Sequence, residues 1–95
     1  MTICDAINHR HLVRFNYDGH ERVVIPAAYG RQVSTHNEVL RGYQIGGTSK
    51  SRVPPLWDLF LVGKMLGFTV LEETFDADPP GYNRGDQYID IQCQL

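Results

Sequence analysis

The sequence lacks several features on which common functions depend. Its 95 residues contain two cysteines and one tryptophan, and no apolar run approaches the ~20 residues of a membrane-spanning helix. The first residues lack the basic start and apolar core of a secretory signal, so we expect no membrane contact and a cytoplasmic location. Nine Lys and Arg against eleven Asp and Glu give a formal charge of −2, which excludes an overall basic field. One small domain over residues 1–95, with a thin core, is expected.

Recognisable catalytic and metal-binding motifs are also missing. Cys4 and Cys93 stand far apart without a CxxC pair, so we predict two reduced, partly buried thiols, although the ends of the chain could be close in space. His9 and His11 have no acidic or cysteine partner at metal-ligand spacing. The Gly46-Gly47 pair does not lead into a phosphate-binding loop. We therefore expect no catalytic residues, no metal and no cofactor, and we expect that the protein is not an enzyme.

The patterning that is present predicts a mainly β protein. Thr2 and Asp5 form a potential capping box for a short helix over about 3–10. Alternating apolar residues from Leu12 to Tyr17, followed by Asp18-Gly19 and a second apolar run, predict a hairpin whose second strand ends or bends at Pro26. Further strands are expected at 29–33, 39–45, 57–62, 68–75 and 88–95, with loops at 34–37, 46–55 and 76–86. The sum is a small SH3-like or Sm-like β-barrel with a short N-terminal helix.

Residues 3–75 contain an ordered set of segments: Ala6-Ile7 with Arg10, a strand that ends in Tyr17, 22–26 (RVVIP), 40–43 (LRGY) and 57–65 (WDLFLVGKM). This set resembles the WYL domain of bacterial regulators. It implies an Sm-like, SH3-type barrel that senses a ligand, often a nucleic acid or nucleotide-like molecule, in transcription regulation and phage defence. Glu38-Val39-Leu40 replaces the triplet that names the family, and Asp58 stands where the family has Arg. Because a second pair of helical segments is missing, we expect a stand-alone domain without a helix-turn-helix.

The resemblance places three cations, Arg22, Arg41 and Lys64, near one pocket. Tyr43 and Gln44 lie beside them in the chain as stacking and hydrogen-bonding candidates. Arginine suits such a site because its planar fork binds phosphate or carboxylate through two parallel N–H groups. The alternative is that these residues are ordinary solvated charges on half-buried strands.

Two hypotheses about function follow. The first is a regulatory domain that binds a small anionic molecule or a short single-stranded nucleic acid through Arg22, Arg41, Tyr43, Gln44 and Lys64. The second is an SH3-like interaction or dimerisation module with no small ligand, which associates with itself or with a regulatory protein. Trp57 is either a plate over the barrel end or an exposed platform for a base. Gly42 is expected to leave an open spot in its strand, where backbone or ligand comes close.

The near-neutral total charge conceals an uneven distribution. Residues 1–64 hold eight Lys and Arg against five acids, a balance of +3, whereas residues 65–95 hold one Arg against six acids, a balance of −5. If the acidic segment folds over the basic part, it competes with an anionic ligand. Neutralising Asp76, Asp78 and Asp86 is then expected to strengthen ligand binding.

Overall fold

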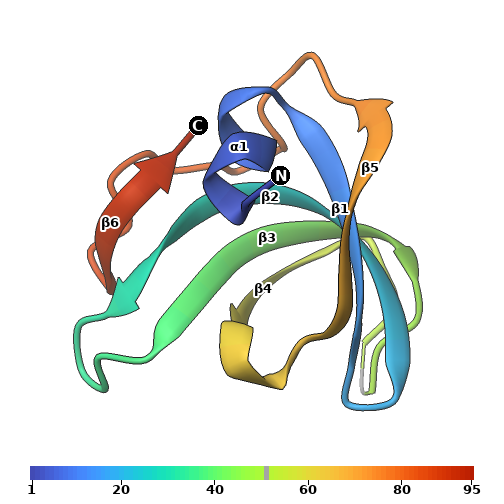
Figure 1. The fold of residues 1–95 in the computed structure, drawn as a ribbon, viewed down its shortest axis with the longest axis horizontal. Helices are drawn as coiled ribbons and strands as arrows, with labels where there is room; N and C mark the ends of the chain where they lie inside the picture. Colours follow the sequence, from blue (N-terminus) through green and yellow to red (C-terminus); the bar gives the residue numbers. More distant parts are fainter. Residues whose placement is uncertain (51) are drawn as a thin grey trace.

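The computed structural model, which describes residues 1–50 and 52–95, shows six antiparallel strands in one strongly bent sheet, with a short helix (Figure 1). The elements are α1 (Ile3–Asn8), β1 (His11–Tyr17), β2 (His20–Gln32), β3 (Glu38–Gly47), β4 (Leu56–Leu61), the 3-10 helix η1 (Val62–Lys64), β5 (Leu66–Thr74) and β6 (Ile89–Gln94). The strands pair in the order β4-β3-β2-β1-β5, and β6 pairs with β2. The predicted small, mainly β, barrel-like fold is confirmed. Ser51, in the predicted loop 46–55, lies outside the described residues.

Local signals at the start of the chain act as predicted. The Thr2 hydroxyl accepts the Asp5 N–H at 3.1 Å, and the Asp5 carboxylate accepts the Thr2 N–H at 2.9 Å, which together form the capping box of α1. The Thr2 N–H that donates to the carboxylate is the main cause that lowers the pKa of Asp5 below its ordinary value, and the Thr2 side chain adds to it. Asp18 and Gly19 both have positive φ, 51° and 77°, and connect β1 to β2 in the predicted hairpin.

Pro26 bends a strand but does not end it. The two strands expected on either side of Pro26 form the single 13-residue strand β2, and its register against β3 shifts between Pro26 and Ala28. A bulge accommodates proline because the ladder is already interrupted there. The half of β2 before the bend pairs with β1, and the half after it pairs with β6 (Figure 1).

The inside of the bent sheet carries the main hydrophobic core. Phe15 and Phe60 meet edge to face at 5.0 Å, and α1 adds Ala6 and Ile7. The expected open spot at Gly42 does not exist: a Cβ there would lie 2.3 Å from Val24 Cγ1, so this glycine is needed for packing against the core. A smaller core forms on the other face of the sheet; its buried members are Ala28, Val39 and Ile89, from β2, β3 and β6.

The cysteines form a disulfide, so the prediction of two reduced thiols is wrong. Cys4 of α1 and Cys93 of β6 have Cα atoms 5.7 Å apart and are bonded through sulfur. The 89-residue separation hides this pairing in the sequence, and only the return of β6 to the side of α1 brings the two thiols together (Figure 1). The bond joins the two ends of the described fold.

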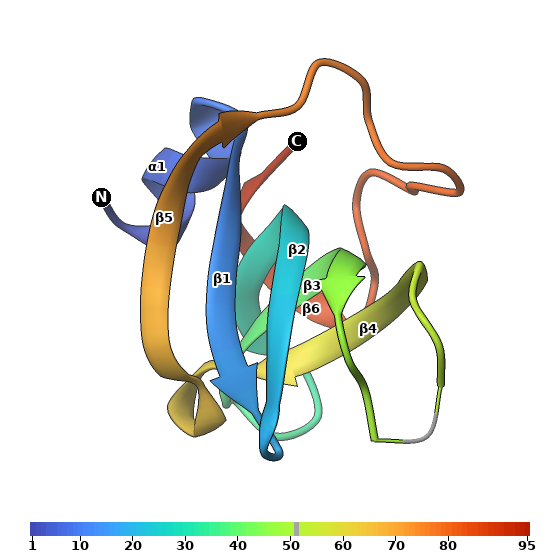
Figure 2. The same cartoon turned by 90° about the vertical axis from the view of Figure 1, so that its right-hand side faces the viewer.

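The segment 75–88 has no regular structure and connects β5 to β6. Figure 2 shows it leaving the top of β5, crossing the molecule and descending past the end of β4 before it enters β6. Its course along the outside of the sheet places polar and aromatic residues against β3 and β4. Among the residues that the structure describes, no helix is long and apolar enough to cross a membrane.

Candidate functional site

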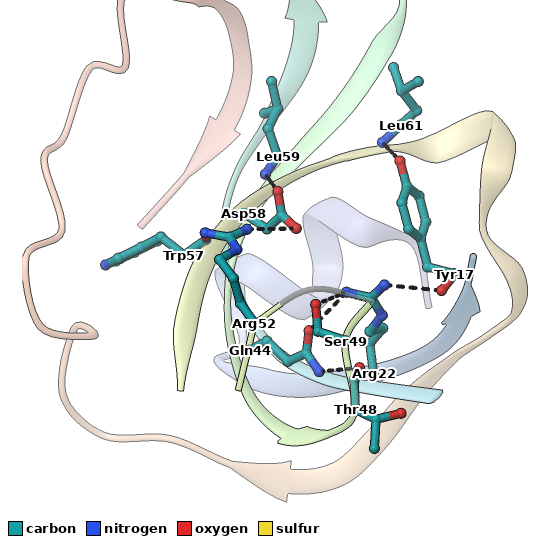
Figure 3. A network of polar contacts seen from close by, with 10 residues as sticks. All are labelled: Tyr17, Arg22, Gln44, Thr48, Ser49, Arg52, Trp57, Asp58, Leu59 and Leu61. Atoms are coloured by element: carbon teal, nitrogen blue, oxygen red, sulfur yellow. Dashed lines mark hydrogen bonds and ion pairs between the residues drawn. The ribbon is translucent and has the colours of Figure 1, made fainter. Parts of the chain in front are cut away.

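Arg22 and Gln44 lie together on the inside of the sheet. Arg22 is 2% exposed and Gln44 is fully buried, and Arg22 Nη1 donates to Gln44 Oε1 at 3.2 Å. Arg22 also donates to the Tyr17 carbonyl at 3.1 Å and to Ser49 Oγ at 3.4 Å. Figure 3 shows these side chains pointing toward one another, with Trp57 extending the other way. Arg22 and Gln44 therefore lie close together, as predicted, but both side chains are buried.

Among the described residues, Arg22 has aromatic rings and neutral acceptors as partners and no carboxylate. Its guanidinium carbon lies 5.5 Å from the Tyr17 ring centroid and 5.8 Å from that of Phe60, distances at which a cation is attracted to the aromatic face. Gln44 Nε2 donates to the carbonyls of Gly46 and Thr48, both at 2.9 Å. This network ties the start of the loop after β3 to the barrel interior. Arg22 and Gln44 therefore have a structural role.

Arg41 and Tyr43 lie on the opposite face of β3, the outer one. Residues alternate between the faces of a strand, so the odd-numbered Arg41 and Tyr43 point outward while Gln44 points inward. Arg41 lines a cavity of about 420 Å³ between this outer face and the segment 75–88. The volume falls in the range of small-molecule sites.

Aromatic residues form one wall of the cavity. Trp57, paired with Tyr43 across β3 and β4, has its ring centroid 5.2 Å from that of Tyr43 and 6.4 Å from that of Tyr82. Its indole N–H donates to the Pro80 carbonyl at 2.7 Å, which fixes the ring. Trp57 and Tyr82 both line the cavity, whereas Tyr43 supports Trp57 from behind. Trp57 is therefore a half-buried wall of the cavity and not a plate over the core.

Tyr82 stays a neutral phenol at physiological pH. Burial raises its pKa above the ordinary value of 10, and its hydroxyl donates to the Leu95 carbonyl at 2.9 Å. That bond holds the ring against Trp57 at the cavity wall. The arrangement offers flat apolar surface for a planar ligand.

A partly buried ion pair joins the sheet to the segment 75–88 at the cavity. Arg41 Nε donates to Asp86 Oδ2 at 2.8 Å, and the two side chains are 27% and 14% exposed. The other Asp86 oxygen accepts the Tyr88 N–H at 3.0 Å. Asp86 is thus the acidic residue that meets one of the predicted site cations. Asp78 pairs with Arg10 instead, outside the cavity.

Lys64 lies away from both groups. It sits in η1 and lines a second cavity, of about 470 Å³, with Arg31, His36 and Glu38. The three predicted cations therefore occupy three places: Arg22 inside the sheet, Arg41 in the outer cavity and Lys64 beside the β2–β3 turn. The prediction that they share one pocket is wrong, because β3 separates Arg22 from Arg41 and Lys64 follows the far end of β4.

Sequence reasoning named Asp86 only as one of three acids that compete with a ligand, and it missed Tyr82 as a member of the site. Both belong to the irregular segment 75–88, whose path has no periodic signal in the sequence. The one available signal was the acidic balance of residues 65–95, which indicated that this segment could meet a basic residue. No group of three or more His, Cys, Asp or Glu able to hold a metal ion occurs among residues 1–50 and 52–95.

Comparison with known proteins leaves the family open. No family model matches the chain, no curated protein matches it, and no solved structure matches it. The site is therefore interpreted from its own geometry.

Proposed function

We propose that this protein is a regulatory domain that binds a small, planar, anionic ligand in the cavity between β3, β4 and the segment 75–88. One observation carries the proposal: Arg41 stands in a cavity of ligand size whose wall contains the aromatic rings of Trp57 and Tyr82. Aromatic rings hold the face of a planar molecule, and a guanidinium holds an oxyanion through paired N–H groups. The resemblance to WYL domains, and a role in bacterial transcription regulation or phage defence, form part of this proposal.

A small ligand suits the site better than a nucleic acid strand does. Binding along a phosphate backbone requires a track of cations, whereas Arg22, Arg41 and Lys64 lie in three separate environments. Arg22 is not available to a strand because it is buried under Ser49. Arg41 is therefore the predicted site cation that carries the proposal.

The location of the protein stays a prediction. The Cys4–Cys93 bond weighs against the expected cytoplasmic location, because disulfides form and persist mainly in oxidising compartments.

A titration followed by the fluorescence of Trp57 tests the function. Trp57 is the one tryptophan of the chain, so its emission reports on the cavity alone. With 3′,5′-cyclic AMP, 5′-AMP and adenosine as probes, we expect saturable quenching by at least one of them. Arg41→Ala is expected to weaken binding of the anionic probe by about tenfold or more, since hydrogen bonds to charged groups are among the strongest.

Lys64→Ala is the matched control, because it removes an exposed cation from another part of the surface. It is expected to leave the titration unchanged. Circular dichroism shows whether Arg41→Ala remains folded. Quenching by none of the probes, or equal affinity for the wild type and folded Arg41→Ala, contradicts the proposed function. If none of the three probes binds but a tetranucleotide does, the ligand is single-stranded nucleic acid and not a small molecule.

A second candidate is the interaction module, which one surface feature favours. Val33 and Tyr88 are 56% and 63% exposed, and the Val33 N–H donates to the Tyr88 carbonyl, so these two apolar side chains stand on neighbouring backbones. Light scattering over a hundredfold range of concentration tests it. A dimer that Tyr88→Ser dissociates is expected for this alternative, and a constant monomer mass in the wild type contradicts it.

A further inference from the structure

The cavity of the proposed site has a formally neutral wall. Its lining residues come from β2, β3, β4 and the segment 75–88. Within the described part of the chain, Arg41 and Asp86 are the two lining side chains charged at neutral pH. The remaining side chains offer aromatic surface and two amides. Attraction for an anion therefore depends on one positive charge that already has a negative neighbour.

The ion pair uses only part of Arg41. Asp86 accepts from Nε, and no residue that the structure describes accepts from Nη1 or Nη2 of Arg41. A guanidinium held in this way presents its two terminal N–H groups as a fork for a second, planar or tetrahedral oxyanion. The carboxylate thus orients the guanidinium toward a ligand and at the same time remains next to it.

Asp86 is held in place by its own backbone surroundings. Its second oxygen accepts the Tyr88 N–H, and its carbonyl accepts the Ile89 N–H at 3.2 Å, where β6 begins. With a side chain only 14% exposed, the carboxylate cannot turn into solvent without breaking these contacts. A ligand oxyanion on the Arg41 fork therefore lies within a few ångströms of a fixed negative charge.

From this arrangement we infer that Asp86 is a specificity-determining residue that limits the ligand to a single negative charge. The inference rests on the proposed function and names its ligand class: a planar ring that carries one singly charged oxyanion, such as a phosphodiester or a carboxylate. The first negative charge on the ligand is balanced by Arg41. A second one has no cation in the wall and meets the Asp86 carboxylate in a partly dry site, where repulsion is strong.

The three probes differ in charge but share most of their structure. Adenosine, 3′,5′-cyclic AMP and 5′-AMP share the same base and ribose, and at pH 8 they carry no charge, one negative charge and two, because the second ionisation of a phosphomonoester has a pKa of about 6. At low ionic strength the wild type is expected to bind the cyclic nucleotide about tenfold more tightly than 5′-AMP. It is also expected to bind the cyclic nucleotide more tightly than adenosine.

Asp86→Asn is the decisive variant. The amide oxygen can still accept the Tyr88 N–H, so the turn is retained while the negative charge is removed. The preference for cyclic AMP over 5′-AMP is expected to fall by about tenfold or more, chiefly because 5′-AMP binds more tightly. Asp78→Asn is the matched control: it removes the same charge from the same segment but at the Arg10 pair, outside the cavity.

Each outcome has a defined meaning. Wild-type affinity for 5′-AMP equal to or above that for cyclic AMP overturns the inference, and so does an Asp86→Asn preference that changes no more than that of Asp78→Asn. Weaker binding of every anionic probe to folded Asp86→Asn also overturns it, because that result assigns Asp86 a positioning role only. Failure of all three probes with both the wild type and Asp86→Asn instead overturns the proposed function, so the two failures are distinguishable.

Discussion

Removal of the Cys4–Cys93 disulfide is expected to lower the free energy of unfolding by about 4–5 kcal/mol, the value for a cross-link that closes a loop of this length. The bond restrains nearly the whole unfolded chain, because 89 positions separate its two cysteines. It also joins α1 to β6, which have no covalent connection other than the intervening chain. A domain of this size has a thin core, so the loss is a large fraction of its total stability.

Urea unfolding of the double variant Cys4→Ser/Cys93→Ser measures this effect without leaving a free thiol. The melting temperature is expected to fall by roughly 15–30 °C for a domain of this length. Reduction of the wild type with dithiothreitol is the matched comparison and is expected to give a similar loss. Equal unfolding curves for the oxidised wild type, the reduced wild type and the double variant would contradict the role of the bond.

Arg22→Ala is expected to destabilise the fold by about 3 kcal/mol or more while leaving the affinity of the Arg41 cavity for its ligand unchanged. The substitution removes the donor to Gln44 Oε1 and the Tyr17 carbonyl in a place from which water is largely excluded. It also removes the cation that packs against the Tyr17 and Phe60 rings. Buried acceptors without donors and a new void both disfavour the native state.

Denaturant unfolding and the Trp57 titration, carried out on the same preparation, separate the structural role of Arg22 from the ligand-binding role that the sequence predicted. Arg14→Ala is the matched control, because Arg14 is an exposed residue of the neighbouring strand β1 and its loss is expected to change stability by less than about 0.5 kcal/mol. If Arg22→Ala is stable and folded but no longer binds the probe, Arg22 is a ligand-binding residue, and its structural role is contradicted.

Most elements of the fold were predictable because their causes are local. The capping box at Thr2 and Asp5 depends on residues three positions apart, and the hairpin at Asp18-Gly19 depends on two residues that tolerate positive φ. The last strand, expected at 88–95, is likewise present as β6. Pro26 was ambiguous from sequence, because whether a proline ends a strand or occupies a bulge depends on the partner strand.

The candidate site was predictable only in part. Arg41 was recognised as a cation that suits an anionic ligand, and the acidic segment was expected to oppose a basic residue. Trp57 was left open between a plate over the barrel end and a platform for a base. Which cation it opposes was not predictable, since the path of residues 75–88 has no periodicity and depends on where β6 pairs with β2. Gln44 lies next to Tyr43 in sequence, but the strand sends these two side chains to opposite faces.

The amino-acid sequence alone determined the mainly β class, the short capped helix, the turns and the uneven charge of the two parts of the chain, because each of these follows from the order of neighbouring residues. The tertiary structure decided the rest. It separated Arg22, Arg41 and Lys64, joined Cys4 to Cys93, and brought Asp86 to Arg41 across 45 positions. Those contacts depend on the bend of β2 and on the return of β6, which place distant residues side by side in a way that no local pattern encodes.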